Sequence, residues 1–224
     1  LYNLFKRHAT EPRHHAGRAN VAEYLHYGYV PHEDNEHAVS LTLAYAFDDA
    51  NLASIASYLG LTHDAANFTN RSNAAIRAGW SAEHEFMCPR TRDGTLKCPL
   101  LPFVPYPGSP HYVEGDAWQW LWFVPSSPQS LVELFSTPSR FVDKLETFLQ
   151  RARKIKSTTL ANPYYWAGNE PDILAPWLFA FVPGALSKTG EATRWIVTNR
   201  YNDKPDGLPG NDDFGALSAW LVWA

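Results

Sequence analysis

The sequence is short of charge, methionine and cysteine, and it contains no long apolar segment. Charged residues make up 19% of the 224 positions, and 19 Lys and Arg stand against 23 Asp and Glu, a formal net charge of −4. Nucleic-acid binding needs concentrated positive charge, so this balance gives no reason to expect a nucleic-acid partner. No apolar run approaches the roughly 18 residues that cross a membrane, so no membrane partner is expected either.

Several familiar catalytic motifs are also missing. There is no Gly-x-Ser-x-Gly nucleophile elbow, and the segment around Lys188 lacks the preceding glycines of a phosphate-binding loop. His32 and His37 would lie about 140° apart around a helix rather than on one metal-binding face. Residues 202–213 have the length of an EF-hand loop, but they carry Lys204 at the third position and aspartate instead of glutamate at the last. These patterns exclude the corresponding classes of site.

Aromatic residues and proline, in contrast, are abundant. The chain has 9 Trp, 11 Tyr, 12 Phe and 17 Pro, and its 45% apolar fraction is enough to build a core. Disorder is therefore not expected. Aromatic-rich, charge-poor chains often line sugar-binding clefts, but a tightly packed core gives the same count. The composition leaves both interpretations open.

Two features predict an oxidising, secretory environment. Cys88 and Cys98 flank a turn-like stretch that contains Asp-Gly, which favours a disulfide across the turn, with two buried free thiols as the alternative. Asn67 and Asn70 each begin an Asn-x-Ser/Thr tripeptide, the acceptor sequence for N-glycosylation. The N-terminus carries no signal-peptide apolar region, so we expect any signal to be removed or to lie upstream. The prediction is a secreted glycoprotein.

Apolar spacing predicts an all-α chain with minor strands and long loops. A helix is expected over residues 37–59, stopped by Gly60. Thr137 has the character of an N-cap followed by Pro138, and an apolar stripe continues to about residue 153. Further helical segments are expected at 172–182, which is almost wholly apolar and predicted to be fully buried, at 192–196, and from Phe214 to the end of the chain. No repeat or linker suggests a second domain.

Three loop segments combine carboxylates, amides, aromatics and glycine, at residues 112–125, 166–171 and 205–215. Cleavage of a glycosidic bond needs one carboxyl group to protonate the leaving oxygen and a second to act as base or nucleophile. Glu114 is followed closely by three tryptophans, and aromatic surroundings favour the raised carboxyl pKa that a catalytic acid requires. Glu114 is therefore the first candidate for a catalytic acid.

Helix capping explains the same residues without catalysis. Glu114 can satisfy backbone donors at a helix N-terminus, and Asn211 or Asp212 can cap the helix expected near Phe214. The string at residues 169–171, Asn-Glu-Pro, can likewise begin a helix. From the residues alone, capping is the stronger interpretation of the two.

Five strings, taken in order, resemble glycoside hydrolase family 92, whose members are exo-acting, calcium-dependent α-mannosidases. They are GYVP at 28–31, AVSLTLAYAFDD at 38–49, YVEGDAWQWLWFVP at 112–125, GNEP at 168–171 and PDGLPGNDDFGALSAW at 205–220. One string would be a weak signal, but five in the family's order form a specific one that covers most of the chain. The resemblance implies an (α/α)6 toroid, joined in the family to an N-terminal β-sandwich domain that this chain lacks.

The resemblance also implies roles for individual residues. Glu114 matches the general acid and Asp213 the general base of an inverting mechanism, with Asp212 beside it in the acidic run. The two carboxyl groups of such a pair stand roughly 6.5–9.5 Å apart, which leaves room for a water molecule. A glucoamylase-like (α/α)6 hydrolase, which inverts without calcium, remains an alternative.

A calcium ion is implied as well. The matching ligands are Asn169 and Glu170, with Gln119, and the ion would bind O2 and O3 of a terminal mannose, since calcium takes about 6–8 oxygen ligands. Side chains expected to contact the sugar are Trp118, Trp166 and Asn211. Two positions depart from the family: Asn211 is acidic in many members, and Ala167 is histidine in many.

The leading hypothesis is hydrolysis of terminal α-mannosidic linkages in mannose-rich glycans or mannoproteins. The alternative from another class is a non-catalytic carbohydrate-binding fragment of such an enzyme. A complete toroid is built from six helix pairs, and fewer candidate helices are found here. The last expected helix ends on apolar residues that need covering. We therefore expect residues 1–224 to form part of one catalytic domain, with the remaining segments of the same enzyme as its partner.

Overall fold

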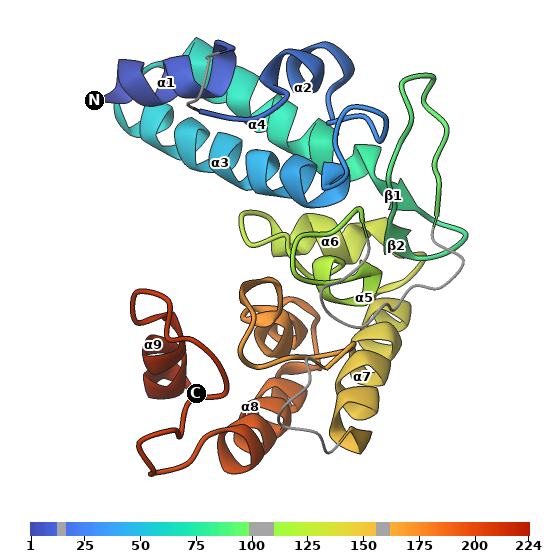
Figure 1. Ribbon diagram of the computed structural model, residues 1–224, viewed down its shortest axis with the longest axis vertical. Coiled ribbons are helices and arrows are strands. Elements are labelled where there is room, and N and C mark those ends of the chain that lie inside the picture. The colour runs from blue at the N-terminus through green and yellow to red at the C-terminus, as the bar shows by residue number, and fades with distance from the viewer. Residues whose placement is uncertain (13–16, 99–109, 156–161) are drawn as a thin grey trace.

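Helices make up most of the computed structural model, which describes residues 1–12, 17–98, 110–155 and 162–224 (Figure 1). In order along the chain the α-helices are α1 (Tyr2–Thr10), α2 (Val21–Tyr27), α3 (Ala38–Tyr58), α4 (Thr62–Ala78), α5 (Ala117–Trp120), α6 (Pro128–Leu134), α7 (Pro138–Lys154), α8 (Leu186–Arg200) and α9 (Ala216–Trp223). Two 3-10 helices, η1 (Glu170–Asp172) and η2 (Ala175–Phe181), precede α8. In the described residues the only sheet pairs β1 (Trp80–Ser81) with β2 (Phe86–Met87), antiparallel. The all-α prediction is confirmed, and the arrangement is consistent with part of a toroid.

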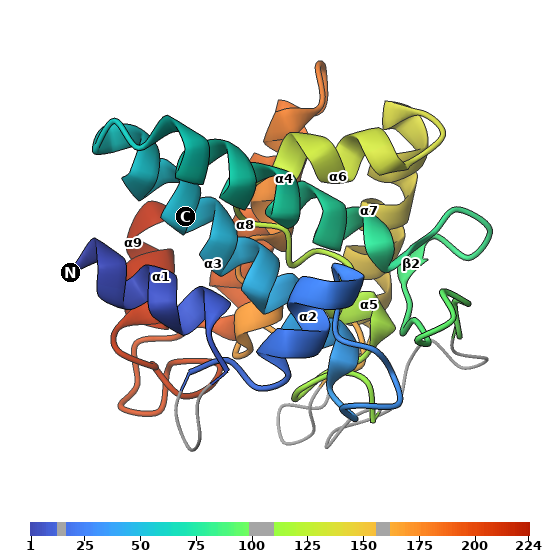
Figure 2. The ribbon, with the colours of Figure 1, turned by 90° about the horizontal axis from the view of Figure 1, so that it is seen from above.

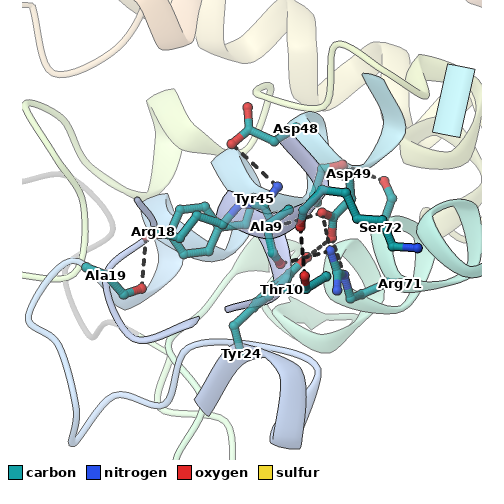
Figure 3. A network of polar contacts seen from close by, with 12 residues as sticks. Ala9, Thr10, Arg18, Ala19, Tyr24, Tyr45, Asp48, Asp49, Arg71 and Ser72 are labelled. Carbon is teal, nitrogen blue, oxygen red and sulfur yellow. Dashed lines mark hydrogen bonds and ion pairs between the residues drawn. The ribbon is translucent and has the colours of Figure 1, made fainter. Parts of the chain in front are cut away.

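Helices α3 and α4 form an antiparallel pair that carries α1 along α3 (Figure 2). The observed α3 agrees with the helix expected over 37–59, and Gly60 follows it with a φ of +73°, the left-handed conformation that ends a helix. A buried ionic cluster ties the pair together (Figure 3). Asp49, 0% exposed, accepts hydrogen bonds from Arg71 at 2.6 Å and Tyr24 at 3.0 Å, and Arg18 lies 2.7 Å away. Two guanidinium groups thus compensate one buried carboxylate.

Helix α7 begins as its sequence predicts. The Thr137 side chain accepts a hydrogen bond from the Arg140 backbone N–H at 3.1 Å, and Pro138 occupies the first turn. Phe141, Leu145 and Phe148 are 0% exposed along one face of the helix. Each such side chain contributes about 1.5–3 kcal/mol by leaving water. The stripe therefore anchors α7 against the tryptophan-bearing segment at 118–122.

The segment 172–182 differs from the prediction in form and in burial. It folds into η1 and η2 rather than an α-helix, and Phe181 is 40% exposed. Proline stands in the first turn of both elements, at Pro171 and Pro176, and it removes backbone donors and disfavours a continuous α-helix. The prediction that the whole segment is buried was wrong.

The C-terminal helix starts later than expected. Helix α9 begins at Ala216, because Gly215 before it has a φ of +89° and Phe214 a φ of +61°. Phe214 therefore lies outside the helix and is fully exposed. Leu217 and Trp220 do lie on its buried face, as the apolar spacing predicts.

Cys88 and Cys98 are joined by a disulfide. The loop between them turns at Asp93, which accepts hydrogen bonds from the Thr91 hydroxyl and the Thr95 backbone N–H. Asn67 and Asn70 both lie on α4 with exposed side chains, and their glycosylation stays a prediction. Across the described ranges, no helix combines the length and apolar character that crossing a membrane requires.

Candidate active site

Three loops that are far apart in the sequence lie close together in the fold. They are residues 112–116, which lead into α5, residues 166–170, which lead into η1, and residues 209–215, which lead into α9. In Figure 1 the orange segment that carries the second loop lies between α5 and α9. These are the three segments in which the sequence places its catalytic candidates, so the fold does bring them together.

The second and third loops touch through glycine. A Cβ placed on Gly168 would lie 2.5 Å from the carbonyl oxygen of Pro209 and 2.9 Å from the Cα of Gly210. Real Cβ atoms do not approach backbone atoms so closely, so a side chain at residue 168 would separate the loops. The glycine permits a backbone contact that sets the distance between residues 169–170 and 211–213.

The first loop presents Glu114 at an exposed turn. Its neighbour Val113 donates its N–H to the Ser40 hydroxyl at 2.8 Å, and Trp120 Nε1 donates to the Val113 carbonyl at 2.8 Å. Asn169, 3% exposed, donates from Nδ2 to the Glu114 carbonyl at 2.7 Å. The turn is thus held from α3, from α5 and from the second loop.

Glu170 and Asp213, from the second and third loops, carry carboxyl groups that interact electrostatically. Burial raises the pKa of Glu170 above its ordinary value, and the proximity of Asp213 raises it further, as does the negative charge of Glu114. The physical reason is that carboxylates placed close together cannot all be ionised at low cost. Three carboxyl groups, one from each loop, therefore lie within electrostatic range of one another.

Both catalytic candidates sit on strained backbone. Glu114 has a φ of +46° and Asp213 a φ of +45°, and Phe214 follows with +61°. This left-handed region costs a non-glycine residue about 1–2 kcal/mol. Such strain concentrates at functional sites, where it aims particular side chains. Here it occurs on two of the three loops that meet.

Asp212 has a structural role at the start of α9. Its carboxylate accepts hydrogen bonds from the Ser218 backbone N–H at 2.9 Å and from the Ser218 hydroxyl at 2.7 Å. These bonds lower the pKa of Asp212. The contact agrees with the capping interpretation, and a catalytic role for Asp212 stays a prediction.

Gln119 is buried, and its side chain joins α5 to the segments around residues 162–164 and 172 through hydrogen bonds. Its Nε2 donates to the carbonyls of Asn162 at 3.0 Å and Tyr164 at 3.2 Å, and to Asp172 Oδ2 at 3.3 Å. The side chain is 3% exposed, and its Oε1 would lie 2.9 Å from a Cβ on Gly115. This position holds loops together, and the calcium contact that the resemblance implies for Gln119 stays a prediction.

The predicted sugar contacts fall in different surroundings. Trp118 is 5% exposed, with its ring stacked on Phe148, and its contact with a sugar stays a prediction. Trp166 is half-buried and lines a cavity of about 550 Å³ together with Tyr201. Asn211 is exposed on the third loop. These last two contacts stay predictions.

Asp116 and Asp172, which the sequence analysis did not single out, stabilise the segments that carry the site. Asp116 accepts the backbone N–H groups of Trp118 at 2.8 Å and Gln119 at 3.1 Å, and so caps α5. Asp172 is 0% exposed, and burial raises its pKa well above the ordinary range. The signal for Asp172 was its position as a lone acid in an apolar stretch.

The oxygen-rich donor set suits a hard cation such as calcium in kind. A cation would also relieve the repulsion among Glu114, Glu170 and Asp213. Within the described part of the chain, however, no three His, Cys, Asp or Glu side chains are grouped closely enough to hold an ion by themselves. Amide oxygens, water and the substrate would have to complete the coordination.

An all-α chain that gathers carboxyl groups from separate loops beside an aromatic cavity has the features of a glycoside hydrolase. The whole chain, residues 1–224, matches the family model for the glycosyl hydrolase family 92 catalytic domain. The chain belongs to this family.

Solved structures of the family resemble this fold closely. The GH92 α-mannosidase BT3965 of Bacteroides thetaiotaomicron, in complex with mannoimidazole, is 28% identical with a TM-score of 0.85, over 99% of this chain and 30% of that one. The GH92 inverting mannosidase BT2199 of the same organism is 26% identical with a TM-score of 0.82, over 99% of this chain and 32% of that one. An uncharacterized secreted glycosidase of Arthroderma benhamiae is 25% identical over 93% of this chain and 29% of its own length. The chain thus spans about a third of the proteins it matches.

Proposed function

We propose that this chain contributes the catalytic carboxyl groups of an exo-acting α-mannosidase that cleaves terminal mannose from mannose-rich glycans or mannoproteins. The observation that carries the proposal is the meeting of Glu114, Glu170 and Asp213 from three separate loops. Family membership supports it, as does the similarity to an α-mannosidase solved with mannoimidazole.

In this proposal Glu114 is the general acid. Its side chain is exposed on a strained turn that Asn169 and Ser40 hold in place, so its carboxyl can reach a bound glycosidic oxygen. Asp213 is the general base, which takes a proton from the attacking water. An inverting pair of this kind needs a separation of roughly 6.5–9.5 Å between the two carboxyl groups, so that water fits between them. The similarity to an inverting mannosidase supports this outcome.

Calcium is part of the proposal. Glu170 would supply a carboxylate, and Asn169 its Oδ1, because Asn169 Nδ2 is already committed to the Glu114 carbonyl. Once bound, the ion would bind the vicinal O2 and O3 hydroxyls of mannose and so select its cis arrangement. Because the pKa of Glu170 is raised, a proton on its carboxyl group would have to leave before a cation binds there.

Release of mannose is the direct test. The protein, with any sequence that naturally flanks these residues, should free mannose from a mannose-rich glycan, and EDTA should abolish the release. Binding without release would favour the non-catalytic alternative. Release that is insensitive to EDTA would favour a calcium-independent hydrolase.

The general acid has its own test. Glu114→Gln should abolish cleavage of natural glycans while sparing aryl mannosides whose leaving groups need no protonation. Equal loss on both substrates would remove Glu114 as the acid. The matched variant is Glu133→Gln, an exposed glutamate on α6 outside the three loops, which should keep both activities.

We also propose secretion and N-glycosylation. The disulfide, the exposed Asn67 and Asn70, and the secreted relative support this. A mass shift on enzymatic removal of N-glycans from the naturally secreted protein, lost in the Asn67→Gln, Asn70→Gln double variant, would establish it. An unmodified mass would refute glycosylation.

A further inference from the structure

Asp172 is a buried carboxyl group directly beneath the proposed active site. It ends η1 two residues after Glu170, and its side chain is 0% exposed. Its backbone N–H donates to the Asn169 carbonyl at 3.1 Å. The residue therefore belongs to the same short turn as Asn169 and Glu170, but it points inward.

One oxygen of Asp172 links two loops. Its Oδ2 accepts the backbone N–H of Trp166 at 2.7 Å and Nε2 of Gln119 at 3.3 Å. Trp166 begins the loop that carries Asn169 and Glu170, whereas Gln119 lies on α5, just after the turn that carries Glu114. Removal of this acceptor would take one hydrogen bond from the Trp166 backbone and one from the Gln119 side chain, which lie on two different loops of the site.

The contacts of Asp172 extend through Gln119 to the turn that carries Glu114, the candidate acid. Gln119 Oε1 packs against Gly115, so a shift of Gln119 changes the support of the Glu114 turn. On the other side, Asn169 Nδ2 returns to the Glu114 carbonyl at 2.7 Å. Asp172, Gln119, Gly115, Glu114 and Asn169 thus form a closed circuit of contacts around the base of the site.

A purely structural role does not account for this carboxyl. Its neighbours along the chain are apolar, and burying an acid without a compensating cation costs stability that an apolar side chain would not. Its other oxygen, Oδ1, has no hydrogen-bond partner in the described ranges. What the carboxyl supplies is the shared acceptor for Trp166 and Gln119.

We propose that Asp172 is a positioning residue that holds the Glu114 turn and the Asn169–Glu170 loop in the relative arrangement required for glycoside cleavage. The inference rests on the proposed function. Asp172 touches neither the substrate nor the reacting atoms; it acts through Gln119 and Trp166. Misplacement of catalytic groups by about 1 Å can cost a factor of about 100 in rate.

Two substitutions at Asp172 separate positioning from packing. Asp172→Asn keeps an oxygen that can accept both hydrogen bonds, so kcat on a mannose-rich glycan should stay within a few-fold of wild type. Asp172→Leu keeps the branching and the number of heavy atoms, with methyl groups in place of the two oxygens, and removes the acceptor. We expect its kcat to fall about 100-fold while the melting temperature is retained, with a smaller loss on an aryl mannoside that needs little acid assistance.

Gln119→Leu provides a second variant from the other side of the contact. It should reproduce the kinetic loss of Asp172→Leu, and the double variant should lose no more than either single one, because the two residues act as one unit. Asp49→Asn is the matched control. It alters an equally buried carboxyl far from the site, so it should lower stability without changing the kcat of the folded protein.

Hydrogen exchange gives a readout that does not depend on activity. Asp172→Leu should increase deuterium uptake at 117–119 and 166–169, whereas Asp172→Asn should not. Full activity in Asp172→Leu, or equal loss in Asp172→Asn, would overturn the positioning role. If the wild-type protein releases no mannose, the proposed function fails, and unchanged exchange in Asp172→Leu would separately refute the link between the loops.

Discussion

Asn169 donates a 2.7 Å hydrogen bond from its side-chain amide to the backbone carbonyl of Glu114, 55 positions earlier in the chain. This bond joins the loop of the proposed calcium ligands to the turn of the proposed acid. Asn169 is 3% exposed, so water could not easily take its place as a donor to the Glu114 carbonyl. The contact makes the two loops one unit.

Asn169→Ala should destabilise the protein by about 1–2 kcal/mol, because it removes a part-buried hydrogen bond and leaves the Glu114 carbonyl without this donor. The measurement is urea unfolding in EDTA, so that any calcium contribution is removed from both proteins. Asn199→Ala is the control, since that exposed amide bonds only within its own helix and its loss should change stability by less than about 0.5 kcal/mol. Equal stability of wild type and Asn169→Ala in EDTA would contradict a stabilising role for the hydrogen bond between Asn169 and Glu114.

Gly168→Ala should separate the second and third loops. The new Cβ would meet the Pro209 carbonyl at 2.5 Å, and neither backbone can yield without moving the loop. We expect a loss of about 1–3 kcal/mol in thermal unfolding and a fall in kcat of about 100-fold.

Gly190→Ala is the matched control for this change. Gly190 lies within α8 with no atom within 4 Å of its added Cβ, so alanine should stabilise the helix by about 0.5–1 kcal/mol. Opposite changes in stability at the two glycines would establish that the close contact at Gly168, and not the loss of a glycine in general, decides the outcome. A Gly168→Ala protein as stable as wild type would contradict the close contact between the second and third loops.

Phe214→Gly should stabilise the fold. Phe214 has a φ of +61° and a fully exposed ring, so glycine relieves the backbone strain and loses little burial. The expected gain is about 1 kcal/mol in chemical denaturation. Phe214→Ala keeps the strain and should show no such gain. A destabilised Phe214→Gly variant would mean that the ring is covered in the natural protein.

Lys144 predicts a dependence of stability on alkaline pH. Burial, together with the charges of Arg140 and Arg151, lowers the pKa of Lys144 from 10.5 to about 8, although the charge of Glu85 opposes the shift. Its Nζ lies 3.8 Å from the Phe86 ring centroid and 4.6 Å from that of Trp118. Between pH 8 and 10.5 the unfolded chain binds more protons than the folded one, so stability should rise with pH in that window.

Lys144→Met removes this titration. The free energy of unfolding of the wild type, minus that of the variant, should rise by up to about 3 kcal/mol between those pH values. Urea unfolding at several pH values in the window measures the difference, and the variant itself corrects for other groups that titrate in alkali. Parallel curves for the two proteins would show that Lys144 keeps an ordinary pKa.

The helices and their ends could be predicted from local sequence. The apolar stripe of α7, its Thr137 cap and the stop after α3 at Gly60 depend on residues within one or two turns of each other. Such rules need no knowledge of the rest of the fold. The failures at 172–182 and at Phe214 also have local causes, in proline and in a run of positive φ angles, which periodicity does not detect.

The candidate site could be predicted only as three loops. Glu114 and Asp213 were recognisable from the strings around them, but their surroundings depend on segments that lie dozens of residues away. Asp212 turned to cap α9, and Gln119 and Trp118 became buried contacts of the second loop and of α7. No pattern within one segment distinguishes a carboxylate that caps a helix from one that faces a substrate.

The sequence by itself determined the all-α class, the cysteine pair and the loops that carry chemistry, because secondary structure and turns follow from near neighbours along the chain. Only the tertiary structure decided which side chains meet. The raised pKa of Glu170, and the use of Asp172 as a common acceptor, arise from contacts between distant loops. Burial then determines their effect, since a polar group removed from water must take its partner from whatever the fold places beside it.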